Sequence, residues 1–200
     1  MAILAGGQAR RLGGRNKGAL HVGRSSIIDR QLATLSGLAD RIFVVAGDPE
    51  PYRDKRVAVI GDLLPGAGAL GGIYTALSVA TTDHVFVLAC DLPFVSRPLV
   101  SRLVGLASPQ FDVVVPRTPD GLQPLCAVYS RRLVEPVRRQ IDSGHLKVVD
   151  LFATARVREL SPDELADIEP ESRAFFNVNT PSDLDEAIRL ATWADGPTER

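Results

Sequence analysis

The chain has 200 residues, of which 45% are hydrophobic and 24% charged, a composition typical of a folded globular protein and not of a disordered one. Its formal net charge of −1 argues against a global positive field, so we expect neither nucleic acid nor a membrane among its partners. The two cysteines, Cys90 and Cys126, lie in apolar runs, which indicates reduced core thiols and no disulfide framework.

Short apolar runs alternate along the chain with segments of helical periodicity. In chain order we expect a strand at Ala2–Ala5, a helix at Ser26–Leu38, strands at Arg41–Ala46 and Arg56–Ile60, a helix at Leu70–Ala80, a strand at His84–Ala89, a helix at Arg97–Ala107, strands at Asp112–Pro116 and Leu125–Tyr129, a helix at Arg131–Ser143, a weaker strand at Arg156–Leu160 and a helix at Pro181–Trp193. Most strands are continuous apolar runs, as in parallel sheets covered on both faces. We therefore predict an α/β fold with a single doubly wound, mostly parallel sheet.

No internal repeat, low-complexity tract or flexible linker divides the chain. We expect residues 1–200 to form one domain, with a disordered tail over residues 194–200. The first residues do not resemble a signal peptide, and no apolar run approaches the roughly 20 residues of a membrane helix. These features predict a cytoplasmic protein.

The loop after the first strand is rich in glycine and basic residues. In a doubly wound sheet, ligands bind beyond the carboxyl ends of the strands, which is where this loop begins. It contains Gly6, Gly7, Gly13, Gly14, Arg10, Arg11, Arg15 and Lys17. Glycines let the backbone approach a ligand, and Arg and Lys neutralise phosphate, so the loop is suited to a triphosphate. A flexible, solvated basic loop is the alternative.

Two aspartates follow other strands at the same predicted edge. Asp91 comes directly after the apolar run 85–90 and could ligate Mg²⁺, although an aspartate near a proline is often a cap or turn residue. Asp62 follows the run 56–60 and could accept hydrogen bonds from a nucleobase amine or a sugar hydroxyl, or it could close a turn.

Gly66 to Gly71 match the G-x-G-x-x-G dinucleotide fingerprint, which leaves a dinucleotide-dependent oxidoreductase as an alternative function. The match is weak because Asp62 to Pro65 separate it from the preceding strand, and Pro65 cannot continue that strand. A glycine-rich approach to a helix start nevertheless suits a nucleobase or phosphate.

Asn177 and Asn179 precede the last helix. They are two residues apart and share one face of an extended segment, so both could orient a ligand. Alternatively the segment is only a helix entry, with Thr180 as the cap and Pro181 in the first turn.

Taken together, these sequence motifs resemble those of the MobA family of molybdenum cofactor guanylyltransferases, within the nucleotidyltransferase superfamily. The family pattern L-A-G-G-x-[SA]-x-R-[ML]-G plus a lysine is matched from Leu4 to Lys17, with Asn16 where Asp is usual. The patterns D-x-x-x-G-x-G-P-L-x-G and P-C-D-[TLM]-P-[FY] are matched from Asp62 to Gly72 and from Ala89 to Phe94, where Ala69 and Ala89 replace the usual prolines. The patterns Q/H-P-L-x-A-x-Y and N-V-N-T-P-x-D-L are matched from Gln123 to Tyr129 and from Asn177 to Leu184. The motifs span residues 2–187, nearly the whole chain.

The resemblance implies a Rossmann-like nucleotide-binding topology, as in nucleotide-diphospho-sugar transferases, and a set of roles. GTP would be bound by Leu4, Ala5, Gly6, Gly7, Lys17, Asp62 and Asp91; the catalytic residues would be Lys17, Arg11 and Asp91; Asp91 would ligate magnesium; and Asn177 and Asn179 would face the pterin.

The implied reaction transfers GMP from GTP to the terminal phosphate of molybdopterin, with or without bound molybdenum, and releases pyrophosphate. Further implied partners are other cofactor biosynthesis proteins, or recipient molybdoenzymes and their chaperones. Related cytidylyltransferases typically have L-A-A-G, so Gly6 after Ala5 favours guanine. A cytidylyltransferase or another transferase of this fold, and a noncatalytic GTP-binding module, remain alternatives.

Overall fold

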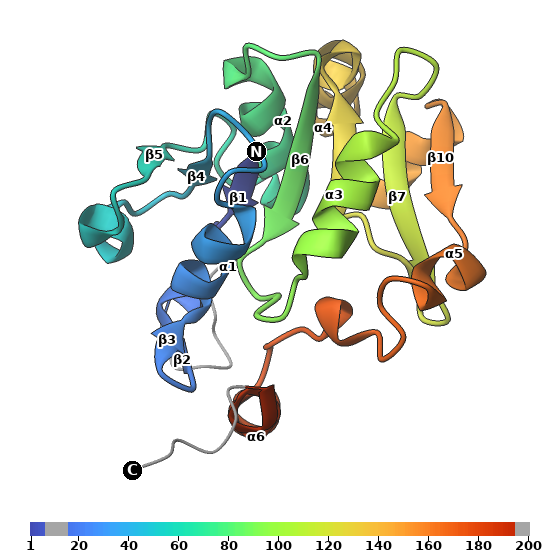
Figure 1. Ribbon diagram of the computed structural model, residues 1–200. Helices are drawn as coiled ribbons and strands as arrows, with labels where there is room; N and C mark the ends of the chain where they lie inside the picture. Colours follow the sequence, from blue (N-terminus) through green and yellow to red (C-terminus); the bar gives the residue numbers. More distant parts are fainter. Residues whose placement is uncertain (7–15, 195–200) are drawn as a thin grey trace.

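A central β-sheet forms the middle of three layers in the computed structural model, which describes residues 1–6 and 16–194 (Figure 1). The sheet has eight strands: β1 (Ala2–Leu4), β4 (Phe43–Val45), β5 (Ala58–Ile60), β6 (His84–Ala89), β7 (Val113–Thr118), β8 (Gly121–Leu122), β9 (Cys126–Ser130) and β10 (Val157–Leu160). Their order is β10-β7-β9-β6-β1-β4-β5, and β8 pairs with β7 alone.

The sheet is mostly parallel, as expected. β9 runs antiparallel to both β6 and β7, and β8 is antiparallel to β7, whereas the other pairs are parallel. The strand order reverses at β1, which has β4 on one side and β6 on the other. This reversal is the switch point at which doubly wound sheets bind ligands.

Helices cover both faces of the sheet. α1 (Ile27–Leu35) and α3 (Arg97–Gly105) lie on the face toward the viewer in Figure 1, and α2 (Gly68–Val79) and α4 (Val134–Asp142) lie behind. Ile3 packs into the core with α1 and α3, whereas Ala2 and Leu4 pack into the core with α2. Because successive strand residues face opposite sides and both sides are covered, the strands are apolar throughout.

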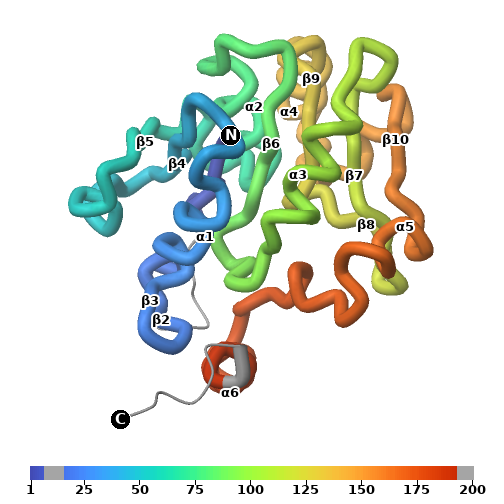
Figure 2. Tube along the Cα trace, in the orientation of Figure 1, coloured from blue at the N-terminus to red at the C-terminus, as the bar shows by residue number. Residues whose placement is uncertain are grey.

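A third group of elements lies beyond the carboxyl ends of the parallel strands. It contains the hairpin of β2 (His21–Val22) and β3 (Ser25–Ser26), and α6 (Pro181–Ala194). They share a small core of Leu20, Val22, Ile27, Val178, Ala187 and Ala191. Figure 2 traces the chain from α5 (Pro162–Ala166) along this edge of the sheet to α6. Short 3₁₀ helices include η2 (Lys17–Ala19), η3 (Glu50–Lys55), η4 (Arg131–Leu133), η5 (Val148–Ala153) and η6 (Arg173–Phe175).

Every predicted strand and helix is present, with ends shifted by a few residues. The segment predicted as one helix over Arg131–Ser143 is η4 followed by α4. The strands β2, β3 and β8 were missed because two-residue strands carry no periodicity. α5 was missed although Ser161 and Glu164 form a capping box. The expected tail began at residue 194, which the structure assigns to α6, and residues 195–200 lie outside the described part.

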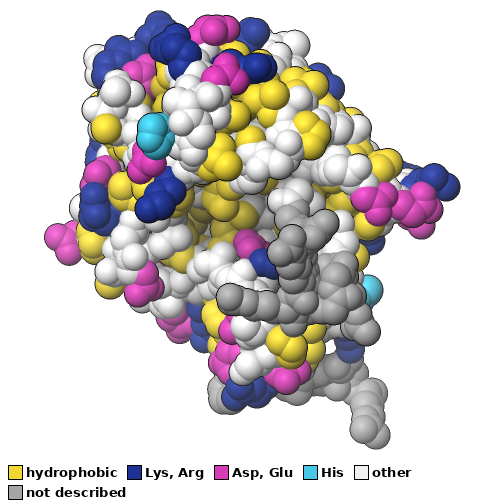
Figure 3. Space-filling view, turned by 180° about the vertical axis from the view of Figure 1, so that it is seen from behind, with side chains coloured by type: hydrophobic (Ala, Val, Ile, Leu, Met, Phe, Trp, Pro, Cys, Tyr) yellow, Lys and Arg dark blue, Asp and Glu magenta, His cyan; other side chains and the backbone are white. Residues whose placement is uncertain are grey.

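Surface and core features agree with the composition. Cys90 and Cys126 are both free and buried, as predicted. Within residues 1–6 and 16–194, no helix is long and apolar enough to cross a membrane. Seen from behind, the molecule shows hydrophobic side chains near its middle, and Lys and Arg side chains mixed with Asp and Glu toward its upper edge (Figure 3).

Candidate active site

Three polar side chains from distant parts of the chain meet at the carboxyl edge of the sheet. Lys17 begins η2, Asp91 follows β6, and Asn179 precedes α6. The Lys17 Nζ atom donates to Asp91 Oδ2 at 2.9 Å and to Asn179 Oδ1 at 2.5 Å. The Lys17 and Asp91 side chains are 19% and 18% exposed, so the pair is largely shielded from solvent but still reachable by a ligand.

The Asp91 carboxylate is only partly used by the protein. Its Oδ2 atom pairs with Lys17, whereas its buried Oδ1 atom has no hydrogen-bond partner among the described residues. No described backbone N–H donates to either oxygen, so the helix-cap interpretation of Asp91 finds no support there. A buried acceptor left free at a ligand-binding edge is suited to a cation or a ligand donor.

This donor set fits a magnesium ion that arrives with a nucleotide. The described residues contain no group of three or more His, Cys, Asp or Glu side chains able to hold a metal ion. Mg²⁺ is usually held by one or two carboxylates, with substrate phosphates and water completing its coordination. Asp91 Oδ1 supplies the kind of ligand that such a site requires from the protein.

Gln31 on α1 supports the turn that carries Asp91. Its fully buried side chain donates from Nε2 to the carbonyls of Ala89 at 2.8 Å and Leu92 at 3.0 Å, one on each side of Cys90 and Asp91. The sequence interpretation missed this residue. The available signal was a polar side chain on the helix face that also carries Ile28 and Leu35.

The end of β1 leaves room next to the backbone. Leu4 and Ala5 are buried, and the Leu4 carbonyl accepts from the Cys90 N–H at 3.0 Å, which ties β1 to the Asp91 turn. Gly6 is exposed, and a Cβ atom added there would meet none of the described residues within 4 Å. A ligand can therefore approach the Gly6 backbone closely. Gly7 and Arg11 lie outside the described residues.

Asp62 lies at the same edge, after β5, but closes its own turn. Its Oδ1 atom accepts from the Leu64 N–H at 3.0 Å and from the Thr75 hydroxyl at 2.9 Å. The turn interpretation is therefore supported, and the nucleotide contact stays a prediction. Gly71 is needed for packing, since a Cβ atom there would lie 2.8 Å from the Leu64 carbonyl oxygen.

The segment before α6 is tied to the Asp91 turn. The buried Val178 donates its N–H to the Asp91 carbonyl at 2.9 Å, and the flanking Asn177 and Asn179 are both exposed. Asp183 Oδ2 accepts from the backbone N–H groups of Asn179 and Thr180, and these bonds hold the pKa of Asp183 below its usual value. The segment is therefore both a helix entry and part of the site.

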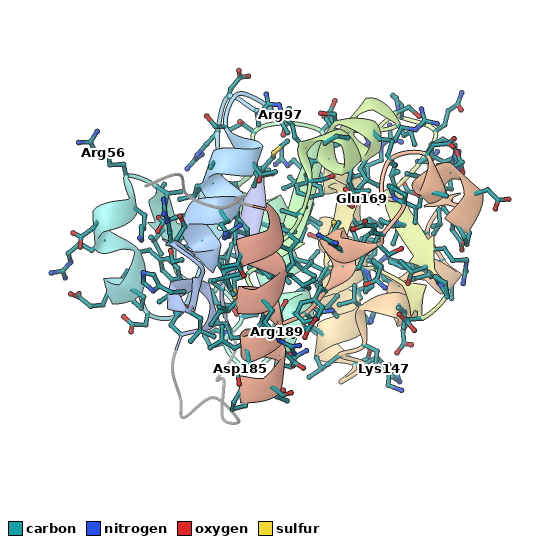
Figure 4. The ribbon with its side chains drawn as sticks, turned by 60° about the horizontal axis from the view of Figure 1, so that its bottom comes forward. Arg56, Arg97, Lys147, Glu169, Asp185 and Arg189 are labelled. Carbon is teal, nitrogen blue, oxygen red and sulfur yellow. The ribbon has the colours of Figure 1, made fainter. Side chains whose placement is uncertain are left out.

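Asn177 and Asn179 contact different parts of the site. Asn179 contacts Lys17, whereas the Asn177 amide donates to the Phe175 carbonyl at 3.1 Å and lines a cavity of about 580 Å³. Thr118 at the end of β7 and Gln123 before β9 also line this cavity. Figure 4 views the molecule from this edge, with α6, which carries the labelled Asp185 and Arg189, lying across it.

The chemistry of the site does not need a protein nucleophile. Burial raises the pKa of the Cys90 thiol to about 12, so this neighbour of Asp91 stays protonated. What remains is a cation and a carboxylate at the switch point of a doubly wound sheet, a combination suited to positioning phosphates and neutralising their charge. This arrangement defines the class: an enzyme that transfers a nucleotidyl group.

The family follows from comparison with known sequences. Residues 1–158 match the sequence model of the MobA-like NTP transferase domain, and the chain belongs to this family. It is 35% identical over 185 residues to the molybdenum cofactor guanylyltransferase of Desulfosudis oleivorans, covering 92% of each chain. It is also 38% identical over 189 residues to the probable molybdenum cofactor guanylyltransferase of Pelotomaculum thermopropionicum, covering 94% of this chain and 91% of that protein.

Solved structures agree with the family. The crystal structure of molybdopterin-guanine dinucleotide biosynthesis protein A from Archaeoglobus fulgidus superposes with a TM-score of 0.81 at 26% identity, covering 95% of this chain and 97% of that one. The 2-C-methyl-D-erythritol 4-phosphate cytidylyltransferase of Thermus thermophilus has the same fold, with a TM-score of 0.69 at 20% identity and coverage of 96% and 98%. The predicted fold class and family are confirmed.

Proposed function

We propose that this protein transfers GMP from GTP to the terminal phosphate of molybdopterin, forming the guanine dinucleotide form of the molybdenum cofactor. The observation that supports this most directly is the Lys17–Asp91 pair, in which Asp91 Oδ1 has no hydrogen-bond partner among the described residues. The names of the relatives, two of them at 35% and 38% identity over most of the chain, support the choice of GTP and a pterin.

In this proposal GTP lies over the end of β1. Leu4, Ala5 and Gly6 approach the guanine and ribose, where the open space beside Gly6 admits a purine. Lys17 binds the triphosphate and Asp62 contacts the nucleotide through Oδ2, because its Oδ1 atom is used within the turn. Gly7 and Arg11 keep the same roles from the sequence, in guanine binding and in charge neutralisation.

Asp91 holds Mg²⁺ in the proposed enzyme through the oxygen that Lys17 does not use. When bound, the ion supplies positive charge to the phosphate oxygens near the reacting phosphorus. Lys17 then shifts part of its pairing from Asp91 to the triphosphate. An ammonium group can neutralise the pyrophosphate as it leaves, which is the main demand of this chemistry.

The second substrate, molybdopterin, occupies the other half of the edge in this proposal. Asn177 lines the cavity of about 580 Å³ beside β7 and β9, and Asn179 lies between that half and Lys17. The terminal phosphate of molybdopterin attacks the α-phosphorus of GTP from this side. A new phosphorus–oxygen bond forms, the bond between the α- and β-phosphates breaks, and pyrophosphate departs.

We further propose that the protein works in the cytoplasm, where the free thiols of Cys90 and Cys126 stay reduced. Its expected protein partners are other enzymes of cofactor biosynthesis or recipient molybdoenzymes and their chaperones.

The decisive test is pyrophosphate release with each of the four nucleoside triphosphates and magnesium, with and without molybdopterin. We expect release with GTP only when molybdopterin is present. Release with CTP as the preferred substrate would identify a cytidylyltransferase instead, and GTP binding without release would identify a noncatalytic module. Calorimetry of GTP against CTP and ATP tests base choice independently of turnover, since a base edge read by hydrogen bonds discriminates strongly.

A further inference from the structure

A buried tyrosine contacts the segment that carries Lys17. Tyr52 lies on η3, in the connection between β4 and β5, and is only 1% exposed. Its hydroxyl donates to Asn16 Oδ1 at 2.5 Å, across 36 residues of sequence. Burial raises the pKa of Tyr52 well above its usual value, so the phenol remains a protonated donor at neutral pH.

Asn16 links this tyrosine to the backbone beside Lys17. Its Oδ1 atom also accepts from the Gly18 N–H at 3.0 Å, so the Tyr52 hydroxyl and the Gly18 N–H share one acceptor oxygen. A backbone N–H can only donate, which fixes Oδ1 and not Nδ2 at this position. The Asn16 side chain therefore has one orientation, and Lys17 starts a 3₁₀ turn capped by it.

The tyrosine ring also packs directly on this turn. A Cβ atom added at Gly18 would lie 3.0 Å from the Tyr52 hydroxyl and 3.3 Å from its ring, so a larger residue there would crowd the contact. Tyr52 belongs to the same core as Cys90, the residue before Asp91. The ring thus packs against the segment that carries Lys17 and shares its core with the residue next to Asp91.

We propose that Tyr52 is a positioning residue of the nucleotide site, acting through Asn16 to hold Lys17 where it meets Asp91 and the triphosphate. This inference rests on the proposed function, because it concerns how well Lys17 binds GTP. Tyr52 does not touch the nucleotide in this scheme. The hydrogen bond to Asn16 removes alternative orientations of the turn before GTP arrives, and such preorganisation contributes to affinity.

The test compares two tyrosines that each lose one hydroxyl. Tyr52→Phe keeps the ring against Gly18 and removes only the bond to Asn16. Tyr129→Phe is the matched control, since Tyr129 is also fully buried, donates to the Pro124 carbonyl at 2.6 Å and belongs to the core on the other face of the sheet. GTP affinity is measured by calorimetry with magnesium and without molybdopterin, and the melting temperature is measured for both.

We expect both variants to lose some thermal stability, but only Tyr52→Phe to bind GTP about three- to tenfold more weakly, in line with one lost hydrogen bond. Asn16→Ala should weaken GTP binding similarly, and Asn16→Asp should retain more affinity than Asn16→Ala because a carboxylate oxygen can accept both bonds. If Tyr52→Phe binds GTP as tightly as the wild-type protein, Tyr52 is only a core residue. If the wild-type protein itself does not bind GTP, the proposed function fails first.

Discussion

Two aspartates follow strands at the same edge of the sheet, yet the protein uses them differently. Asp62, after β5, gives its Oδ1 atom to the Leu64 N–H and the Thr75 hydroxyl, so it stabilises its own turn. Asp91, after β6, contacts Lys17 through one oxygen and leaves the other without a described partner. The turn at Asp91 is instead held by Gln31. Where another residue supports the turn, the carboxylate remains available for a ligand.

The largest expected effect separates these two residues. Asp91→Asn should keep the fold but lower turnover by at least about two orders of magnitude, since one electrostatic contributor of roughly 3 kcal/mol is lost. Asp62→Asn should lower turnover by less than about tenfold, because the amide oxygen can still accept both turn bonds. Steady-state kinetics at saturating magnesium check this. Near-normal turnover of the Asp91 variant would mean that Asp91 is only a turn residue.

The partner of Asp91 gives the next prediction. Lys17→Ala should weaken GTP binding, because it removes a charged phosphate contact worth roughly 1.5–3 kcal/mol. Because the family resemblance assigns Asn179 to the pterin, Asn179→Ala should weaken molybdopterin binding or lower turnover and leave GTP affinity within about twofold. Since Asn179 Oδ1 accepts directly from Lys17, a larger loss would show that the contact matters for the nucleotide as well. Titration of each variant with both substrates measures the two effects.

Two glycine substitutions are expected to have smaller effects, one in the Asp62 turn and one at the end of β1. Gly71→Ala should destabilise the protein by about 1–3 kcal/mol, because the new Cβ atom would lie 2.8 Å from the Leu64 carbonyl oxygen in the Asp62 turn. Gly6→Ala should leave stability nearly unchanged, as no described residue lies within 4 Å of its Cβ position, but should weaken GTP binding. Thermal melts and calorimetry distinguish the two. An unchanged melting temperature for the Gly71 variant would contradict the packing argument.

The smallest expected effect concerns acid pH. Hydrogen bonds, first of all from the Asn179 N–H, lower the pKa of Asp183 from its unfolded value of 3.8. The Asp183 carboxylate therefore contributes stability that is complete above about pH 4 and is lost as the pH falls through the folded pKa. Asp183→Asn should flatten this acid branch and leave the slope near neutral pH unchanged, as measured by chemical denaturation between pH 2 and pH 7. An unchanged acid branch would mean that another carboxylate dominates it.

The sequence predicted where the candidate site lies because the carboxyl ends of parallel strands meet at one edge of the sheet. That rule was enough to place the loop that contains Lys17 and the residue Asp91 at the same edge. It could not find the contact between Tyr52 and Asn16, because nothing in either local sequence encodes a contact between loops so far apart. It also treated Asn177 and Asn179 as one pair, since spacing shows a shared face but not the different neighbours along it.

The reversed direction of β9 has a consequence for how the site can change. Because β9 runs against its neighbours, its first residues and not its last ones reach the edge where the other strands end. Thr118 and Gln123 therefore border the cavity from the connection that joins the end of β7, which arrives at this edge, to the start of β9, which leaves it. Lengthening or replacing that hairpin would reshape the wall facing the acceptor molecule while β1 and β6, which carry the nucleotide half, keep their register. Under the proposed function, one inverted strand would thus make acceptor choice and nucleotide binding separately adjustable within a single sheet.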